Sequence, residues 1–247
     1  MYSEDKGFFY WTTKVLSYQL DINKEISTMA IAELLQEVAG THANYSGFGY
    51  NDVIDKNMVW VLNALKFEVL HRPHWDDEIR IKTWVVDSRR FFSRRDFQIF
   101  DSKGNVIVEA TSVWILYNFE KKRPQSIEPM NFPVKLQAGI YAVDKPIVTS
   151  KEVLDAKAKL SFTVSYSDLD MVGHMNNTRY FQKIMDSYSL SFHHENKLKS
   201  IEIQFRNEAK YNEQLEIRTM DNELGFVHEI RRQSDDKSVC LVKVEWY

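Results

Sequence analysis

The stretch from Thr163 to Asp186 concentrates the residue types that could do chemistry. Asp170 and His174 lie four residues apart, and the two amides Asn176 and Asn177 follow the histidine. A carboxylate close to an imidazole can move protons. The spacing alone leaves two interpretations open: a catalytic site, or a helix start at which Asp170 or Asn176 serves only as a cap.

Three predicted elements position these side chains. Residues 163–166 alternate like the end of a strand, and residues 167–173 are turn formers that end in Gly173. A helix is predicted over 175–192, because its apolar residues recur at helical spacings. His174 should therefore lie in the first turn of this helix, where backbone N–H groups without intrahelical partners could bind an acyl oxygen.

The motif Asp-Leu-Asp-x-x-x-His-Met-Asn-Asn-x-x-Tyr, which begins at Asp168, resembles the active-site segment of the acyl-acyl carrier protein thioesterases. Four more segments are similar to that family and occur in the same order: Gly47-Phe-Gly-Tyr50, Trp60-Val-Leu-Asn63, Arg94-Arg95-Asp96-Phe97 and Ala110-Thr-Ser-Val-Trp114. The resemblance extends over residues 8–247. It implies a double hotdog fold and the hydrolysis of acyl thioesters on acyl carrier protein.

Length and composition exclude several classes of protein. The 247 residues allow one large domain or two of ordinary size, and 44% hydrophobic residues suffice for a substantial core. A net charge of −3 argues against a nucleic-acid binder. No apolar run is long enough to span a membrane, and the N-terminus lacks the features of a signal or transit peptide, so a cytoplasmic location is expected. The single cysteine, Cys240, excludes an internal disulfide.

The sequence pattern indicates two copies of one unit, each with a strand, a helix and an antiparallel meander. The first copy is predicted to contain a helix over 26–42 that ends near Gly40, a loop over 41–56, and strands over 8–20, 57–70, 78–87, 89–100 and 106–118. In the second copy, strands are predicted over 160–166, 199–208, 214–220, 225–233 and 238–247. Four of the five prolines fall between 120 and 158, which indicates a connector.

The predicted fold class is α+β, a tandem hotdog in which two long helices are each wrapped by antiparallel strands that form a continuous sheet. We expect an N-terminal hotdog domain over 1–135, a linker over 136–158 and a C-terminal hotdog domain over 159–247. The two copies align with Asp21 on Asp170, an offset of 149 residues that falls to 136 in the sheet. The first copy therefore has 13 more residues between helix and sheet. An unrelated single α+β domain is the alternative.

The resemblance assigns a catalytic network of Asp170, His174 and Glu208. It implies that Glu208 and His174 activate water, and that Asp170 orients the network or stabilises developing charge. Which carboxylate is the base stays open at this point. We expect the network in the second domain alone, because the matching positions of the first copy hold Asp21, Glu25 and Arg72. A thioester is activated enough to need no metal, and no cofactor is expected.

One position departs from the family pattern. Val172 stands where the family usually has an Asn, and valine cannot form a side-chain hydrogen bond. Three interpretations stay open. Asn176 or Asn177 supplies the hydrogen bond that the family Asn would make, that Asn is dispensable for the chemistry, or the enzyme is slower. Ala209 stands where plant relatives carry a cysteine, so a cysteine nucleophile is excluded there.

By the family pattern, the N-terminal domain holds the acyl chain. Eight apolar side chains are candidates for lining it, with ordinary core packing as the alternative for each: Met29, Leu34, Leu35, Phe48, Tyr50, Trp60, Trp84 and Trp114. The basic residues Arg89, Arg90, Arg94 and Arg95 are candidates for steering acidic acyl carrier protein with its phosphopantetheine-linked chain. A solvated strand edge is the alternative. Exposed edge strands also allow a homodimer.

The sequence therefore predicts a hydrolase of acyl carrier protein thioesters that releases free fatty acid at the end of fatty acid synthesis. An acyl-coenzyme A thioesterase on the same fold is the first alternative. A non-catalytic acyl-binding protein is the second, and ligand-dependent stabilisation without turnover would indicate it.

Overall fold

The computed structural model describes residues 1–247 except 128–133, 144–155, 157 and 224. The chain divides into two compact units, Met1–Ile147 and Val148–Tyr247. Much of the predicted linker over 136–158, and Pro129, Pro133 and Pro146, lie outside the described residues. None of the helices in the described part of the chain has the length and apolar character of a membrane-spanning segment.

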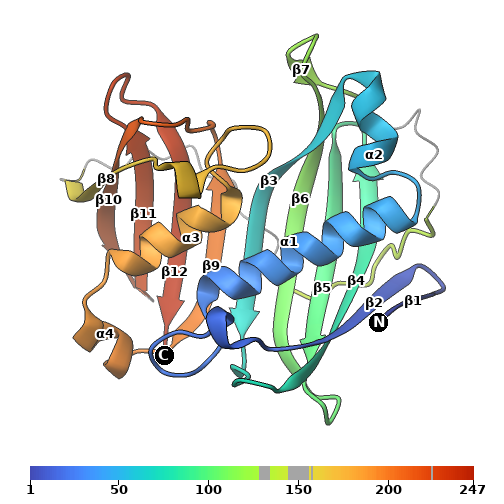
Figure 1. Ribbon diagram of the computed structural model, residues 1–247, viewed down its shortest axis with the longest axis horizontal. Helices are drawn as coiled ribbons and strands as arrows, with labels where there is room; N and C mark the ends of the chain where they lie inside the picture. Colours follow the sequence, from blue (N-terminus) through green and yellow to red (C-terminus); the bar gives the residue numbers. More distant parts are fainter. Residues whose placement is uncertain (128–133, 144–155, 157, 224) are drawn as a thin grey trace. The chain divides into compact units, whose positions relative to one another are not determined.

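The first unit is an antiparallel sheet with one long helix, α1, across one face (Figure 1). Its strands pair in the order β1-β2-β4-β5-β6-β3, with the short β7 beside β6. The elements are β1 (Tyr2–Asp5), β2 (Phe8–Lys14), α1 (Thr28–Tyr45), α2 (Tyr50–Val53), β3 (Met58–Val69), β4 (Glu78–Arg89), β5 (Phe92–Phe100), β6 (Val106–Asn118) and β7 (Arg123–Pro124), with short 3-10 turns η1 (Ser17–Gln19) and η2 (Ile54–Lys56).

Helix α1 begins at Thr28, two residues after its predicted start, and also ends later than predicted. The Ser27 side chain accepts a hydrogen bond from the backbone N–H of Ala30 at 3.1 Å, which caps the first turn. The predicted end near Gly40 is wrong, because the helix continues through the buried His42 to Tyr45. Gly47 then adopts a φ of +76°, a left-handed conformation that suits glycine just past a helix. Burial of the following turn outweighs the weak helix propensity of Gly40.

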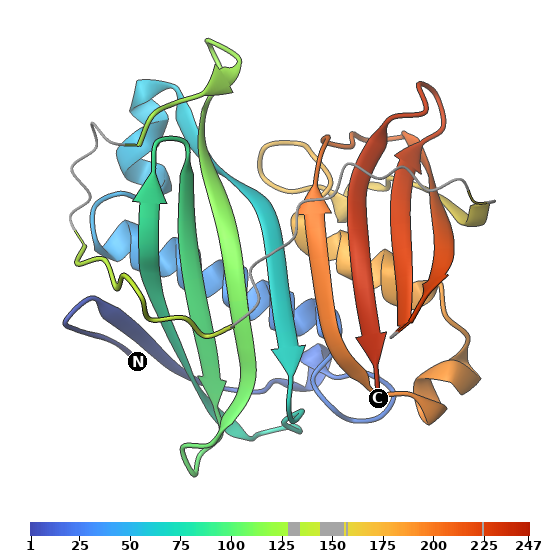
Figure 2. The ribbon, with the colours of Figure 1, turned by 180° about the vertical axis from the view of Figure 1, so that it is seen from behind.

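The second unit repeats this arrangement with a shorter helix and a five-stranded sheet in the order β9-β12-β11-β10-β8. Figure 2 shows the faces of both sheets that carry no helix among the described residues. The elements are β8 (Ala158–Thr163), the 3-10 turn η4 (Tyr166–Asp168), α3 (Asn177–Asp186), α4 (Leu190–Glu195), β9 (Leu198–Phe205), β10 (Gln214–Asn222), β11 (Gly225–Arg232) and β12 (Ser238–Trp246).

The predicted helix over 175–192 is two helices. The Ser187 hydroxyl donates to the Ile184 carbonyl at 2.7 Å and closes α3, and Ser189 accepts from the backbone N–H of Phe192 at 3.2 Å and caps α4. Serines compete for backbone hydrogen bonds in this way at helix ends. The apolar spacing continues across the break, so periodicity alone did not reveal it.

Backbone bridges confirm the predicted alignment of the copies. Leu20 pairs with Ile26 in the first unit as Leu169 pairs with Met175 in the second, and Glu25 pairs with His74 as His174 pairs with Lys210. The offset between equivalent residues falls from 149 to 136 across these pairs. The short helical segments α2 and η2 occupy the region of the extra residues.

Candidate active site

The turn before α3 is held closed by the backbone and the Asp170 carboxylate. The Asp170 backbone N–H donates to the His174 carbonyl at 2.8 Å, and the Gly173 N–H donates to the Asp170 carbonyl at 3.1 Å. The Asp170 Oδ1 atom accepts from the backbone N–H groups of Val172 at 3.0 Å and His174 at 3.1 Å. Gly173 has a φ of +82°, a conformation that glycine adopts without steric cost. This carboxylate fixes the backbone that carries His174.

A second set of backbone contacts brings Glu208 to the histidine. The Met175 N–H donates to the Ala209 carbonyl at 2.8 Å, next to the bridge between His174 and Lys210. Glu208 lies just beyond the end of β9, not at the end of the strand as predicted. Its Oε2 atom lies 3.1 Å from His174 Nδ1. Two positions far apart in the sequence thus form one acid-base pair.

The His174–Glu208 pair is partly open to solvent. The side chains are 32% and 55% exposed, respectively. Lys210 Nζ lies 3.8 Å from Glu208 Oε1, and Arg232 donates to the Glu208 backbone carbonyl. Since Glu208 contacts Nδ1, the ring nitrogen Nε2 remains available for a water or a substrate.

The two asparagines have different environments. The Asn176 Oδ1 atom accepts from the backbone N–H and the hydroxyl of Thr178, both at 2.9 Å, so Asn176 is the cap of α3. Asn177 is the first residue of α3 and is half-buried. The prediction that His174 lies in the first helical turn is wrong, because it precedes the cap and its N–H is already bound by Asp170. Val172 is 53% exposed and contributes its backbone N–H to the turn.

The equivalent place in the first unit has the same backbone and different chemistry. Asp21 Oδ1 accepts from the Asn23 N–H at 2.8 Å, and the Asp21 N–H donates to the Glu25 carbonyl at 2.8 Å. Arg72, at the position of Glu208, donates to the Ile26 carbonyl and to the Thr28 hydroxyl. Burial lowers the pKa of Arg72, and the nearby carboxylates of Asp21 and Glu25 oppose that shift. A guanidinium cannot serve as a base here.

Comparison with known proteins decides the family. The acyl-ACP thioesterase N-terminal domain model matches residues 7–131, and the C-terminal domain model matches residues 151–247. The chain belongs to the acyl-ACP thioesterase family. It is 27% identical over 221 residues to an oleoyl-acyl carrier protein thioesterase of Coriandrum sativum, covering 81% of this chain and 58% of that one. It is 29% identical over 227 residues to oleoyl-acyl carrier protein thioesterase 2 of Arabidopsis thaliana, and this match covers 83% of this chain and 61% of the relative.

The chain thus spans about six tenths of the length of these curated plant relatives. Solved structures in the same family confirm the tandem hotdog fold. The acyl-ACP thioesterase of Bacteroides thetaiotaomicron superposes with a TM-score of 0.88 at 24% identity and covers 98% of both chains. The 12:0-ACP thioesterase of Umbellularia californica superposes with a TM-score of 0.86 at 22% identity, and the match covers 99% of both chains.

The candidates for the acyl-chain site in this family member fall into three environments. Leu35 and Trp114 line a cavity between α1 and the sheet, described below. Phe48 and Trp60 form an edge-to-face pair, and Trp60 Nε1 donates to the Phe48 carbonyl at 2.8 Å. The remaining candidates on the α1 side are the half-buried Met29, the buried Leu34 and Tyr50, which is 36% exposed.

Trp84 does not belong with these residues. Its neighbour Val85 packs against Ala43 and Phe48 on the α1 side, whereas Trp84 packs with Ala142 and Val143 on the other face of the sheet. Its Nε1 atom donates to the Ile140 carbonyl at 2.9 Å. Side chains alternate between the faces of a strand, so Trp84 lies on the face of the sheet opposite to α1, apart from the other candidates for the acyl-chain site.

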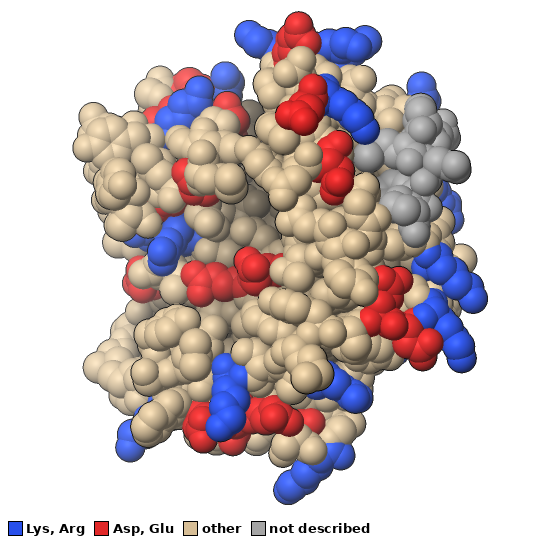
Figure 3. Space-filling model, turned by 45° about the vertical axis from the view of Figure 1, so that its right-hand side comes forward, with Lys and Arg blue, Asp and Glu red and all other residues tan. Residues whose placement is uncertain are grey.

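The four basic candidates for carrier contact also separate. Arg95 is 4% exposed and lies 2.7 Å from His42 Nδ1, so it faces the core and cannot meet a partner protein. Arg94 forms a bidentate pair with the fully buried Asp96 and covers that carboxylate. Arg89 and Arg90 are exposed in the β4–β5 hairpin. On the face shown in Figure 3, Lys and Arg are interspersed with Asp and Glu.

Sequence reasoning missed the remaining residues that line the cavity: Gln36, Leu62, Leu65, Phe97 and Ser112. Alternation places Leu62 and Phe97 on the same face as the predicted Trp114, whereas Leu65 joins them only because the register of β3 shifts between Leu62 and Ala64, which the sequence does not reveal. Among the described residues, no group of three or more His, Cys, Asp or Glu side chains could hold a metal ion.

Proposed function

We propose that this protein hydrolyses acyl carrier protein thioesters and releases free fatty acids at the end of fatty acid synthesis, in the cytoplasm expected from the sequence. The observation that carries the proposal is the 3.1 Å approach of His174 Nδ1 and Glu208 Oε2, in a chain whose two halves both match the family. The plant relatives named as acyl carrier protein thioesterases support the substrate class.

In the proposed reaction, Glu208 favours the imidazole tautomer that carries its proton on Nδ1. Nε2 of His174 then has a free lone pair and removes a proton from water as the water attacks the thioester carbonyl. The tetrahedral intermediate collapses, and the same proton passes to the departing sulfur. A thiol is a good leaving group because its pKa is close to 8.5, so little assistance is needed. His174 is thus the base and Glu208 orients it.

The proposed donor to the developing oxyanion is Asn177. Among the described residues, neither its backbone N–H nor its side-chain amide has a protein partner. It is also the first residue of α3, where the helix dipole favours negative charge. Asn176 is committed to capping, which leaves Asn177 for the task that the family usually gives to an Asn at position 172.

The test is release of fatty acid from acyl carrier protein thioesters and from matched coenzyme A esters. We expect His174→Ala and Glu208→Ala to lower kcat by roughly 10²–10⁴-fold on the carrier esters. The exposed residues His194 and Glu195 on α4 offer matched controls, and His194→Ala and Glu195→Ala should keep full activity. Circular dichroism would verify that all four variants fold.

Three results would contradict the proposal. Faster cleavage of the coenzyme A esters would assign the chain to a coenzyme A thioesterase on the same fold. Binding of acyl ligands without turnover by the wild type would indicate an acyl-binding protein. Full activity of His174→Ala would refute the assigned base.

A further inference from the structure

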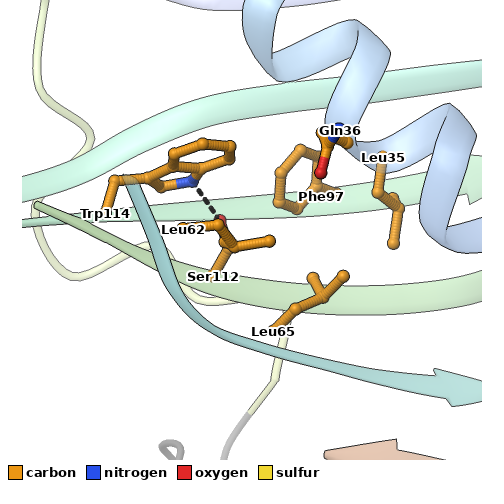
Figure 4. Close-up of a pocket in the computed structure, with 7 residues that line it drawn as sticks. All are labelled: Leu35, Gln36, Leu62, Leu65, Phe97, Ser112 and Trp114. Carbon is orange, nitrogen blue, oxygen red and sulfur yellow. Dashed lines mark hydrogen bonds between the residues drawn. The ribbon is translucent and has the colours of Figure 1, made fainter. Parts of the chain in front are cut away.

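A narrow cavity lies between α1 and the sheet of the first unit (Figure 4). No part of it is wide enough for a water molecule, and the space between its atoms is about 160 Å³ when open solvent is included. Four of its seven lining residues have hydrocarbon side chains, a fifth is Trp114, and none is charged; the seven are Leu35, Gln36, Leu62, Leu65, Phe97, Ser112 and Trp114. The lining therefore suits a hydrocarbon chain once the leucine side chains move apart.

One buried polar atom in this lining has no hydrogen-bond partner among the described residues. The Ser112 hydroxyl accepts from Trp114 Nε1 at 2.8 Å and donates to the Arg95 carbonyl at 3.2 Å, so both of these side chains are satisfied. The Gln36 Oε1 atom is buried and accepts no hydrogen bond from any described residue. Figure 4 shows this oxygen directed from α1 toward the sheet, beside Phe97.

An unpartnered buried acceptor is costly, and the narrow cavity leaves no room for a water to satisfy it. Leucine or methionine would fit an apolar lining without that cost. The polar atom is therefore better explained by a ligand that supplies a hydrogen-bond donor. The donor must itself be uncharged, because the lining offers no counter-charge.

We propose that the cavity selects acyl chains that carry a hydroxyl group, which donates to Gln36 Oε1. This inference rests on the proposed hydrolase function and narrows its substrate class. A hydroxyl donates and accepts, so it matches the Gln36 amide in either of its two orientations. A keto group only accepts, so it could pair with the Gln36 amide only if the NH2 group, and not Oε1, faced the cavity. A carboxylate or ammonium group would be buried without a partner.

The experiment compares carrier thioesters of one chain length, either unsubstituted or with a single hydroxyl at successive carbons. The variants are Gln36→Leu and, as a control, Glu37→Leu, which changes the adjacent exposed residue of α1. For at least one hydroxyl position, the wild type and Glu37→Leu should have a kcat/KM about 3- to 10-fold above that for the unsubstituted chain, a ratio typical of one net hydrogen bond. Gln36→Leu should lose this preference and have equal kcat/KM values for the hydroxylated and unsubstituted chains.

The inference is overturned if no hydroxyl isomer is preferred by the wild type, or if Gln36→Leu retains the preference. If the wild type cleaves no ester at all, the hydrolase proposal fails separately. In that case, calorimetry would measure the binding of free hydroxylated and unsubstituted fatty acids to the wild type, Gln36→Leu and Glu37→Leu. Loss of the hydroxyl preference in Gln36→Leu would support the inference, and an unchanged preference would refute it.

A second measurement separates this role from a structural one. If Gln36 serves a ligand, Gln36→Leu removes an unsatisfied acceptor and should raise the melting temperature of the ligand-free protein. A lower melting temperature would show that the amide stabilises the fold and would count against the proposal.

Discussion

At the scale of single residues, comparing Asp21 in the first unit with Asp170 in the second separates the role of the aspartate from that of the histidine and glutamate. Asp21 and Asp170 form the same turn with the same backbone contacts, although only the second copy has a histidine and a glutamate beside it. Asp21 stabilises its turn although the first unit has no histidine–glutamate pair, so the aspartate has a role in the turn itself. We infer that Asp170 positions His174 through the backbone.

This inference predicts different effects for two substitutions of Asp170. Asp170→Asn keeps an oxygen that can accept from the N–H groups of Val172 and His174, so it should retain most of the activity. Asp170→Ala removes the acceptor and should cost about 1 kcal/mol of stability and more than tenfold in kcat. Chemical denaturation and steady-state kinetics measure the two quantities. Equal loss of activity in both variants would instead show that the negative charge takes part in the reaction.

At the scale of elements, the start of α3 combines a cap and a proposed oxyanion donor in adjacent residues. Asn176→Asp should preserve stability and activity, because aspartate is as good a cap as asparagine. Asn177→Asp replaces a donor with a carboxylate that repels the developing negative charge. We expect it to lower kcat by roughly 10²-fold or more without loss of stability. Kinetics and melting curves of this matched pair test the assignment, and equal activities would remove Asn177 from the mechanism.

The segment between α3 and α4 attaches to β11 through a buried histidine. His228 Nε2 lies 2.6 Å from the Tyr188 hydroxyl, and Nδ1 lies 2.9 Å from the Thr219 hydroxyl. Burial, with a smaller contribution from Lys159, lowers the pKa of His228 to about 3. Burial also raises the pKa of Tyr188 above its ordinary value. Both side chains are therefore neutral in the folded protein at neutral pH.

The low pKa of His228 predicts sensitivity to acid. The unfolded chain binds a proton on this ring below a pH of about 6.5, whereas the folded chain does not bind it until pH falls to about 3. The contribution of the neutral His228 ring to the free energy of unfolding is complete above pH 6.5. Below that pH it decreases by at most about 1.4 kcal/mol per pH unit. His228→Gln should be less stable at pH 7 and yet lose less stability between pH 6.5 and 4.5. Denaturant titrations across this range would detect the shallower slope, and parallel slopes would contradict the assignment.

The sequence predicts the order of elements better than their ends. Strand β6 begins and ends where alternation places it, whereas α1 passes Gly40 and the second helix breaks at Ser187–Ser189. Helix ends depend on which side chains reach free backbone groups, which periodicity does not encode. The His174–Glu208 contact needed the family resemblance, because the backbone contacts that join the two segments, at His174–Lys210 and Met175–Ala209, have no local sequence pattern. The burial of Arg95 was also missed. Its charge suggests a surface position, but the alternation of side chains along β5 directs it into the core.

At the scale of the whole molecule, the exposed Arg89 and Arg90 remain the candidates for carrier contact. Arg89 is 84% exposed and contacts Asp87 at 3.1 Å, and Arg90 lies over the Phe91 ring. Reversing both to Glu should raise KM for carrier-linked substrate and leave KM for a simple acyl ester unchanged. The wild-type KM for the carrier ester should also rise with salt, because exposed charges are screened. Equal changes for both substrates would show that the hairpin does not bind the carrier.

The equivalent turns of the two units also show how little their backbone depends on side-chain identity. In each unit a backbone bridge joins the turn to the loop that follows β3 or β9, whichever side chains occupy the two ends. The side chains at the positions of Glu25 and Arg72 can therefore differ from His174 and Glu208 while the turn stays the same. One copy pairs an imidazole with a carboxylate, and the other has a half-buried guanidinium that binds the start of its own helix. The same backbone geometry thus accommodates two different sets of side chains.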